Sequence, residues 1–133
     1  MTFRERQDLF LENLSFFDNW TDRFNYLINL SDEFPPECPE YLLPYRILFC
    51  KSRTYFYPFI QDNQLYVLGW SNSAVMAGLI VAMRTIFNNT SREEFQDTLI
   101  DFHTKSELIF NLTPLRLDGL NEMIRRITVL FNT

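Results

Sequence analysis

Two runs of aromatic and β-branched residues in the middle of the chain constrain its fold more than any other feature. Residues 54–60 read Thr-Tyr-Phe-Tyr-Pro-Phe-Ile and residues 65–70 read Leu-Tyr-Val-Leu-Gly-Trp, with the polar residues 61–64 between them. Runs of this kind joined by a short polar turn predict an antiparallel β-hairpin. Residues 47–49 can pair as a third, shorter strand, and Pro58 then belongs at an edge or a bulge.

Helical periodicity precedes the hairpin. The apolar spacing predicts one helix over residues 8–16 and a second over residues 19–30, with Asp18 as the N-cap of the second. Four prolines then favour an extended connector, because each removes a backbone donor and disfavours helix in the residue before it: Pro35, Pro36, Pro39 and Pro44.

Three further helices are predicted after the hairpin. Residues 71–73 (Ser-Asn-Ser) offer caps for a helix that runs through Phe87, and Gly78 inside it marks a close packing contact. Thr90 and Glu93 have the spacing of a capping box, which starts a short helix through Thr98. Pro114 stands in the first turn of a last helix. Its apolar stripe comprises Leu117, Leu120, Ile124, Ile127 and Leu130 or Phe131.

Composition favours one compact domain over residues 1–133. A content of 47% hydrophobic and 17% aromatic residues is enough for one hydrophobic core and argues against disorder. The economical architecture is an α+β fold: a small three-stranded antiparallel sheet with helices covering one face.

Charge and hydropathy exclude two classes of partner. A net charge of −5 argues against nucleic acid, and the adjacent basic pair Arg125-Arg126 is interpreted as a solvated helix face. No apolar run approaches the ~20 residues of a membrane span, and the N-terminus is charged rather than signal-like. We therefore expect a cytoplasmic protein without a membrane partner. Its two cysteines should then stay thiols, although a Cys38–Cys50 disulfide remains an alternative.

Few groups of residues in the chain could form a catalytic, metal-binding or phosphate-binding site. His103 is the sole histidine, and nothing near it supports a role as a catalytic base, so it is interpreted as an ordinary surface or satisfied residue. Two cysteines twelve positions apart and one distant histidine give no zinc site, so no metal is expected. The acidic residues fall on loops and helix starts, and the glycines are too widely spaced for a phosphate cradle.

Cys50 is the remaining candidate for chemistry. It lies at a junction between apolar runs, and its basic neighbours Lys51 and Arg53 favour the thiolate over the thiol. Cys38 lies inside the proline-rich connector and is interpreted as a small residue packed under a loop.

Three segments in order resemble the SufE family, small proteins that accept sulfur from a cysteine desulfurase. They are the Cys-Lys-Ser of residues 50–52 after a strand, the strand-to-helix junction of residues 71–79, and Leu-Thr-Pro-Leu-Arg-Leu-Asp-Gly-Leu at residues 112–120. The resemblance runs from about Leu9 to about Leu130.

The resemblance implies a specific role for several residues. Cys50 would take sulfane sulfur as a persulfide from a SufS-type cysteine desulfurase and pass it to an iron–sulfur scaffold complex. Arg116 would lie near the cysteine loop and contact the partner or favour the thiolate. The chain would stimulate the desulfurase rather than act as a free-standing enzyme, and would carry no cofactor, since pyridoxal phosphate belongs to the desulfurase. The supporting or partner-binding residues would be Lys51, Ser52, Arg53, Ser71, Asn72 and Arg116.

The chain also departs from the family pattern. SufE proteins usually have Gly-Cys-Gln-Ser-Gln where residues 49–53 read Phe-Cys-Lys-Ser-Arg, so a residue able to adopt positive φ is replaced by Phe49. The usual Ser-Asp after the hairpin is Ser71-Asn72, and Tyr55 stands where tryptophan is common. Aromatic side chains such as Phe49, Tyr55 and Trp70 could shelter a persulfide.

Two other functions stay open at this stage. The first is a module of the same fold that binds and regulates a desulfurase without using Cys50. The second is an iron–sulfur scaffold, because SufE resembles IscU-type scaffolds in fold, but such scaffolds need several cysteine ligands and this chain supplies one at the site.

Overall fold

The computed structural model describes residues 1–48 and 51–132. Its sheet has three antiparallel strands in the order β1-β2-β3, with β1 at Thr54–Gln61, β2 at Gln64–Ser71 and β3 at Thr90–Ser91. The helices are α1 (Phe3–Ser15), α2 (Trp20–Leu30), α3 (Ala74–Phe87), α4 (Arg92–Asp97), α5 (Phe102–Lys105) and α6 (Pro114–Phe131), with 3₁₀-helices η1 (Ser31–Glu33), η2 (Glu40–Tyr45) and η3 (Leu108–Phe110). The predicted α+β fold is confirmed.

The hairpin is tighter than its sequence suggests. Strands β1 and β2 pair from Thr54 and Ser71 to Gln61 and Gln64, which leaves a two-residue turn. Both turn residues have positive φ, 53° at Asp62 and 63° at Asn63, as in the type I′ turn that matches the twist of the strands. Strand β1 is an edge strand, which confirms the position expected for Pro58.

The third strand is not the one predicted. Arg46 forms an isolated bridge with Tyr55 and the Ile47 amide donates to the Thr54 carbonyl, but no strand continues through the described residues 47 and 48. The Arg126 guanidinium binds the carbonyls of Tyr45, Arg46 and Phe56, which removes acceptors that a longer strand would need. Instead, Thr90–Ser91 pairs with Gln64 and Leu65. Phe49 lies outside the described residues.

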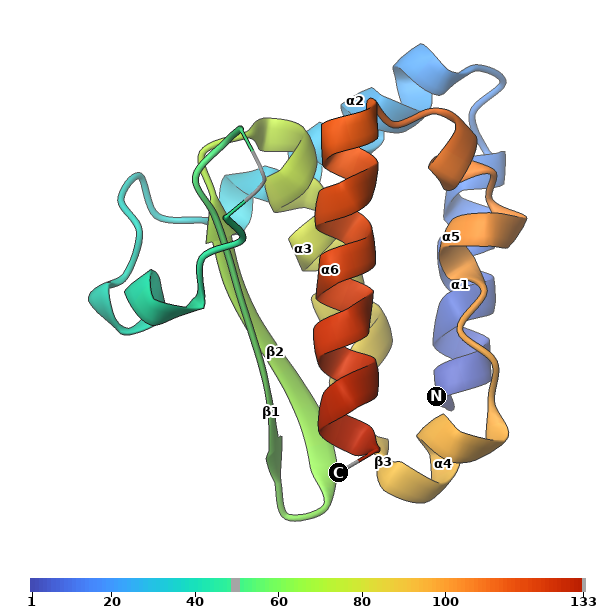
Figure 1. Cartoon of the computed structure of the whole chain (residues 1–133). Helices are drawn as coiled ribbons and strands as arrows, with labels where there is room; N and C mark the ends of the chain where they lie inside the picture. The colour runs from blue at the N-terminus through green and yellow to red at the C-terminus, as the bar shows by residue number, and fades with distance from the viewer. Residues whose placement is uncertain (49–50, 133) are drawn as a thin grey trace.

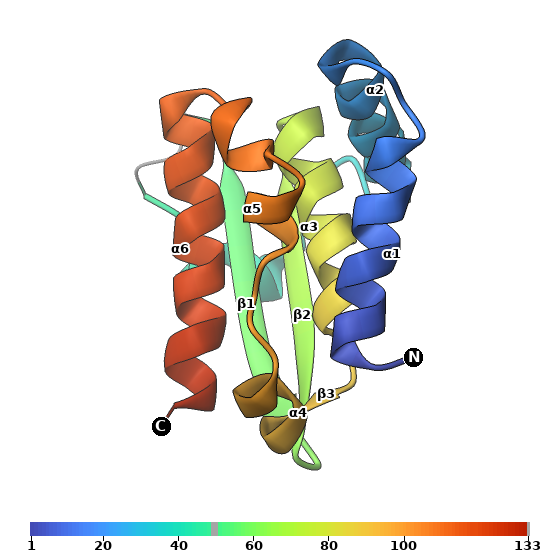
Figure 2. The same ribbon diagram turned by 90° about the vertical axis from the view of Figure 1, so that its right-hand side faces the viewer.

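The two faces of the sheet have different covers. Helices α3 and α6 pack on one face, with α1 beyond them (Figures 1 and 2). On that side, Phe56, Leu65 and Val67 belong to the main core, together with residues of α1, α3 and α6. The segment with η2 lies against the opposite face, where Leu42 packs with Tyr55 and Trp70 (Figure 1).

Helix α3 is the centre of this core. Eleven of its residues are buried, and a Cβ added at Gly78 would stand 1.9 Å from the Leu27 carbonyl oxygen of α2. The predicted packing role of Gly78 is therefore confirmed, because only glycine lets the two helices approach so closely. No helix in the described ranges 1–48 and 51–132 is long and apolar enough to cross a membrane.

Three helix starts differ from the predicted ones. Helix α1 begins five residues earlier, at Phe3, because Thr2 and Glu5 form a capping box. Asn19, not Asp18, accepts the capping hydrogen bond of α2 from the Asp22 amide. Ser91, not Thr90, caps α4, since Thr90 is buried in β3.

Two further segments differ from the prediction. The proline-rich segment contains η2 rather than a fully extended chain, since the fixed φ of proline suits a 3₁₀ turn as well as extended backbone. Helices α5 and η3 are too short to show periodicity and escaped prediction.

Candidate functional site

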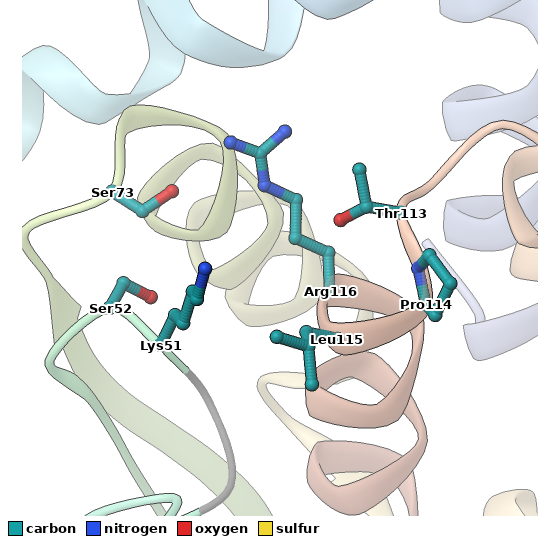
Figure 3. Close-up of a pocket in the computed structure, with 7 residues that line it drawn as sticks. All are labelled: Lys51, Ser52, Ser73, Thr113, Pro114, Leu115 and Arg116. Atoms are coloured by element: carbon teal, nitrogen blue, oxygen red, sulfur yellow. The ribbon is translucent and has the colours of Figure 1, made fainter.

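A pocket of about 470 Å³ opens at the end of the hairpin opposite its turn. Lys51 and Ser52, just before β1, lie on one side, and residues 113–116 at the start of α6 lie on the other (Figure 3). The Arg116 side chain reaches from α6 towards Ser73 at the start of α3 (Figure 3). The full lining is Lys51, Ser52, Ser73, Thr113, Pro114, Leu115 and Arg116.

Two helices begin at this pocket. Ser73 is the N-cap of α3 and accepts a hydrogen bond from the Met76 amide at 3.3 Å. Thr113 is the N-cap of α6, and Pro114 occupies the first turn, where its missing N–H is not needed. The N-terminal end of a helix carries partial positive charge, so both helices favour an anion at this end of the molecule.

The basic side chains at the pocket lack ion-pair partners within the described part of the chain. No carboxylate within residues 1–48 and 51–132 forms an ion pair with Lys51, Arg53 or Arg116. Instead, the Arg53 guanidinium lies 5.4 Å from the centre of the Trp70 ring. Other cations, such as Arg4, Arg84 and Arg126, do form ion pairs with carboxylates. The pocket thus gathers basic side chains that have no ion-paired carboxylate among the described residues, although the chain carries a net charge of −5.

A chain of hydroxyl groups fixes the edge of the pocket. Ser52 Oγ lies 2.8 Å from Thr54 Oγ1, which lies 2.9 Å from Ser71 Oγ. Ser71 Oγ also accepts from the Ser73 amide at 3.1 Å. Thr54 and Ser71 are buried, so these hydrogen bonds link the start of β1, the end of β2 and the start of α3 with little competition from water.

Asn72 joins the same two strand ends through the backbone. The Arg53 amide donates to Asn72 Oδ1 at 2.8 Å, and the Asn72 amide donates to the Arg53 carbonyl at 3.1 Å. The segment that follows residue 50 is thereby held in register with the end of β2.

The comparison with protein families identifies the relatives of this chain. The model of the SufE family, described as an Fe-S metabolism associated domain, matches residues 8–130. The chain belongs to the SufE family. This membership agrees with the resemblance of residues 50–52, 71–79 and 112–120 to SufE sequences.

Individual SufE relatives are divergent. An uncharacterized SufE-like protein of Rhizobium meliloti is 29% identical over 127 residues, covering 90% of this chain and 90% of the relative. An uncharacterized SufE-like protein of Rhizobium etli is 24% identical over 131 residues, covering 94% and 88%. The solution structure of a hypothetical protein from Thermus thermophilus has a TM-score of 0.73 at 18% identity, covering 96% of this chain and 93% of that one, which shows a shared fold.

The structure brings together most of the residues that the SufE resemblance selected. Lys51, Ser52 and Arg116 line the pocket, while Arg53, Ser71 and Asn72 hold its edge. Cys50 lies outside the described residues, and Lys51, which follows it in the chain, lines the pocket.

Several pocket residues were not selected as site residues from the sequence. Their signals in the sequence were their place at helix caps and their membership of the family-matched segments 71–79 and 112–120. These residues are Ser73, Thr113, Pro114 and Leu115, and Thr54 beside the pocket was also not selected.

Cys38 has the surroundings of a packed thiol. It is a free cysteine, it packs against the cluster of Leu42, Tyr55 and Trp70, and its Sγ donates to the Pro39 carbonyl at 3.4 Å. Burial raises the pKa of the Cys38 thiol, and the charge of Arg53 offsets part of that effect. Tyr55 and Trp70 are buried in this cluster and do not line the pocket, so the suggested shelter of a persulfide by aromatic side chains stays a prediction.

His103, expected to be an ordinary surface or satisfied residue, is half-buried with one ring nitrogen unsatisfied in the described part of the chain. Its Nδ1 atom is buried and has no hydrogen-bond partner among the described residues. Burial lowers the pKa of the imidazole, with Asp101 acting in the opposite direction. His103 lies on α5 and does not line the pocket.

Proposed function

We propose that this chain takes sulfane sulfur onto Cys50 from a SufS-type cysteine desulfurase and carries it to iron–sulfur cluster assembly. The observation that carries the proposal is the pocket next to residue 50 in sequence, where Lys51 and Arg116 converge without acidic partners among the described residues. Membership of the SufE family, which is associated with Fe–S metabolism, supports it. The unit of function is one SufE-like domain over residues 1–133, acting in the cytoplasm, where thiols stay reduced.

The proposed chemistry is thiol–persulfide exchange. The Cys50 thiolate attacks the terminal sulfur of the desulfurase cysteine persulfide, a new S–S bond forms on Cys50, and the old S–S bond breaks. The desulfurase cysteine leaves as a thiolate, and the proton of its persulfide remains with the transferred sulfur or passes to water. No oxidant is needed, because one S–S bond breaks as another forms and the transferred sulfur keeps its oxidation state.

Positive charge at the pocket serves this exchange. The reactive forms of the acceptor before and after transfer are the thiolate and the perthiolate, which are both anions. Lys51, Arg116 and the first turns of α3 and α6 favour an anion without a dedicated base. Ser52 and Arg53 are held in place by the hydroxyl chain and by Asn72, and so present the segment after Cys50 in one conformation.

The replacement of the usual family Ser-Asp by Ser71-Asn72 is compatible with this role. Asn72 Oδ1 accepts the Arg53 amide hydrogen, a contact that a carboxylate oxygen would make in the same way. The change removes a negative charge beside the basic residues and keeps the structural hydrogen bond.

Mass spectrometry tests the proposal directly. The protein is incubated with a SufS-type desulfurase, pyridoxal phosphate and cysteine, and peptides are mapped in wild type, Cys50→Ala and Cys38→Ala. We expect added sulfur on Cys50 in wild type and in Cys38→Ala, and none on the corresponding peptide of Cys50→Ala.

The same experiment distinguishes the alternative function. If an active desulfurase binds the chain but leaves Cys50 unmodified, the protein is a regulatory module that does not use its thiol. If Cys50→Ala still stimulates the desulfurase to the wild-type rate, the result supports the regulatory module and rejects the acceptor role.

A further inference from the structure

Arg126 joins three separate segments of the chain. From α6, its Nη1 donates to the carbonyls of Tyr45 and Phe56, both at 2.8 Å, and its Nη2 donates to the carbonyl of Arg46 at 3.1 Å. Its Nε donates to Glu122 at 2.8 Å. The side chain is 21% exposed, so four of its donor contacts form at a largely covered position. The sequence-based interpretation of Arg125-Arg126 as a solvated face is therefore wrong for Arg126.

Arg125 provides an internal contrast. It precedes Arg126 on the same helix, but its side chain is 60% exposed and, within residues 1–48 and 51–132, donates to Glu122, from Nε and Nη2, both at 2.7 Å. Both arginines lower the pKa of Glu122, Arg125 more strongly. Two adjacent residues of the same type thus differ in exposure and in contact with the backbone of residues 45–46 and Phe56.

The contacts of Arg126 bear on the geometry of the pocket. One wall is formed by residues 51–52 at the start of the hairpin and the other by residues 113–116 at the start of α6. Arg126 fixes α6 to β1 through Phe56 and to residues 45–46, at the beginning of the segment that leads to Lys51. Arg116 and Arg126 are ten residues apart on one helix, a rise of about 15 Å, so this attachment sets the position of the whole helix relative to the hairpin.

We propose that Arg126 is a positioning residue for the sulfur transfer to Cys50, a role that rests on the proposed function. Its guanidinium fixes the first residues of the 45–53 segment and holds the first turn of α6 at the distance from Lys51 that the pocket requires. Arg126 acts through the backbone of Tyr45, Arg46 and Phe56 and touches no reacting atom. The planar fork of arginine suits this task, since one side chain serves three carbonyls and one carboxylate.

The experiment compares Arg126→Gln, Arg126→Lys and the matched control Arg125→Gln in a Cys38→Ala background. Hydrogen exchange is measured for peptides over residues 45–56 and over α3, and single-turnover sulfur transfer to Cys50 is measured with saturating desulfurase. We expect Arg126→Gln to raise exchange at residues 45–56 and leave α3 protected, with transfer slowed ~10–100-fold because the acceptor is misplaced.

The two remaining variants separate charge from geometry. Arg126→Lys keeps the positive charge, but its three donors sit on one nitrogen and cannot serve three carbonyls and the Glu122 carboxylate at once, so it should resemble Arg126→Gln in both measurements. Arg125→Gln should stay within about twofold of wild type, because it loses only an exposed ion pair.

Several results would overturn the inference. They are unchanged exchange at residues 45–56 in Arg126→Gln, a loss of protection that is equal in α3, or an effect of Arg125→Gln as large as that of Arg126→Gln. If the wild-type chain takes no sulfur, the proposed function and the transfer role of Arg126 fail together. Unchanged transfer despite local exchange would reject the positioning role while leaving the proposed function intact.

Discussion

The interior around α3 and the pocket at its first turn are built from opposite kinds of contact. Inside the molecule, α3 packs its buried residues against α2, β1 and β2, and Gly78 lets the Leu27 backbone approach. At the pocket, the same helix begins at Ser73 among hydroxyl groups and basic side chains that have no acidic partners in the described part of the chain.

The two ends of this contrast assign different roles to parts of one helix: the buried part of α3 stabilises the fold, and its first turn forms part of the pocket. Burial of apolar surface gives the interior its share of the stability of the fold. Unpaired like charges at the pocket contribute nothing favourable to folding and are useful only when an anion arrives. Substitutions in the interior should therefore change stability, whereas substitutions of the pocket cations should change reactivity at nearly constant stability.

The largest effect should come from Gly78→Ala in the interior. A Cβ 1.9 Å from the Leu27 carbonyl oxygen cannot be accommodated without separating α2 from α3, so we expect a loss of at least about 3 kcal/mol in the free energy of unfolding. Thr85→Ala, at an exposed site of the same helix, should stay within about 0.5 kcal/mol. Urea unfolding measures both, and a Gly78→Ala protein as stable as wild type would contradict the packing described for α3.

A smaller effect should follow Thr54→Val at the boundary between the two regions. The change keeps the shape of the side chain but removes the hydroxyl that links Ser52 and Ser71, leaving buried polar groups with fewer partners. We expect a loss of ~1–2 kcal/mol. Thr85→Val, an equivalent change at an exposed position, is the control for thermal unfolding. Equal effects at both positions would show that the hydroxyl chain adds nothing to stability.

The smallest effect concerns paired charge far from the pocket. Hydrogen bonding from Arg4, with help from Lys105, lowers the pKa of Asp101 below its ordinary value, so the folded state favours the carboxylate. The resulting stability is present above the unfolded pKa and is lost as pH falls through the folded pKa. Because Arg4 is partly exposed and screened by solvent, we expect less than about 1 kcal/mol.

The pH dependence of this contribution can be measured with Asp101→Asn. The difference in stability between wild type and Asp101→Asn should be constant above about pH 5 and should shrink as the pH falls below about 4. A difference that persists unchanged at about pH 2, below the ordinary carboxyl range, would mean that the ion pair is not its source.

The fold was predictable where local signals and tertiary packing agree. The hairpin, α3 and α6 follow from strand composition, turn residues and helical period, and Gly78 from its place inside an apolar helix. The third strand was not predictable, because Thr90 and Ser91 form two residues of ladder with no period of their own, while the Arg126 side chain occupies carbonyls near residues 47 and 48.

The candidate site was predictable in part, through the family resemblance rather than through spacing. Arg116 is distant from Lys51 and Ser52 in sequence, and only the packing of α6 beside the hairpin places the three on one pocket. Thr113 and Ser73 could be read as helix caps, but nothing in a linear pattern shows that two caps face the same space. Arg126 is indistinguishable from Arg125 in sequence, because its distinctive partners are backbone carbonyls far along the chain.

The most direct test of the account compares the reactivity of the two thiols. Alkylation of Cys50 and Cys38 by iodoacetamide is followed by peptide-mapped mass spectrometry across pH in wild type, Lys51→Gln and Arg116→Gln. Burial raises the pKa of Cys38. The proposed function assigns Lys51 and Arg116 the role of favouring the thiolate of Cys50, so Cys50 should react faster at about pH 7. Each variant should reduce that advantage while its unfolding free energy stays within about 0.5 kcal/mol of wild type. Equal or reversed rates for the two cysteines, or rates that do not change in the variants, would contradict the role assigned to the pocket.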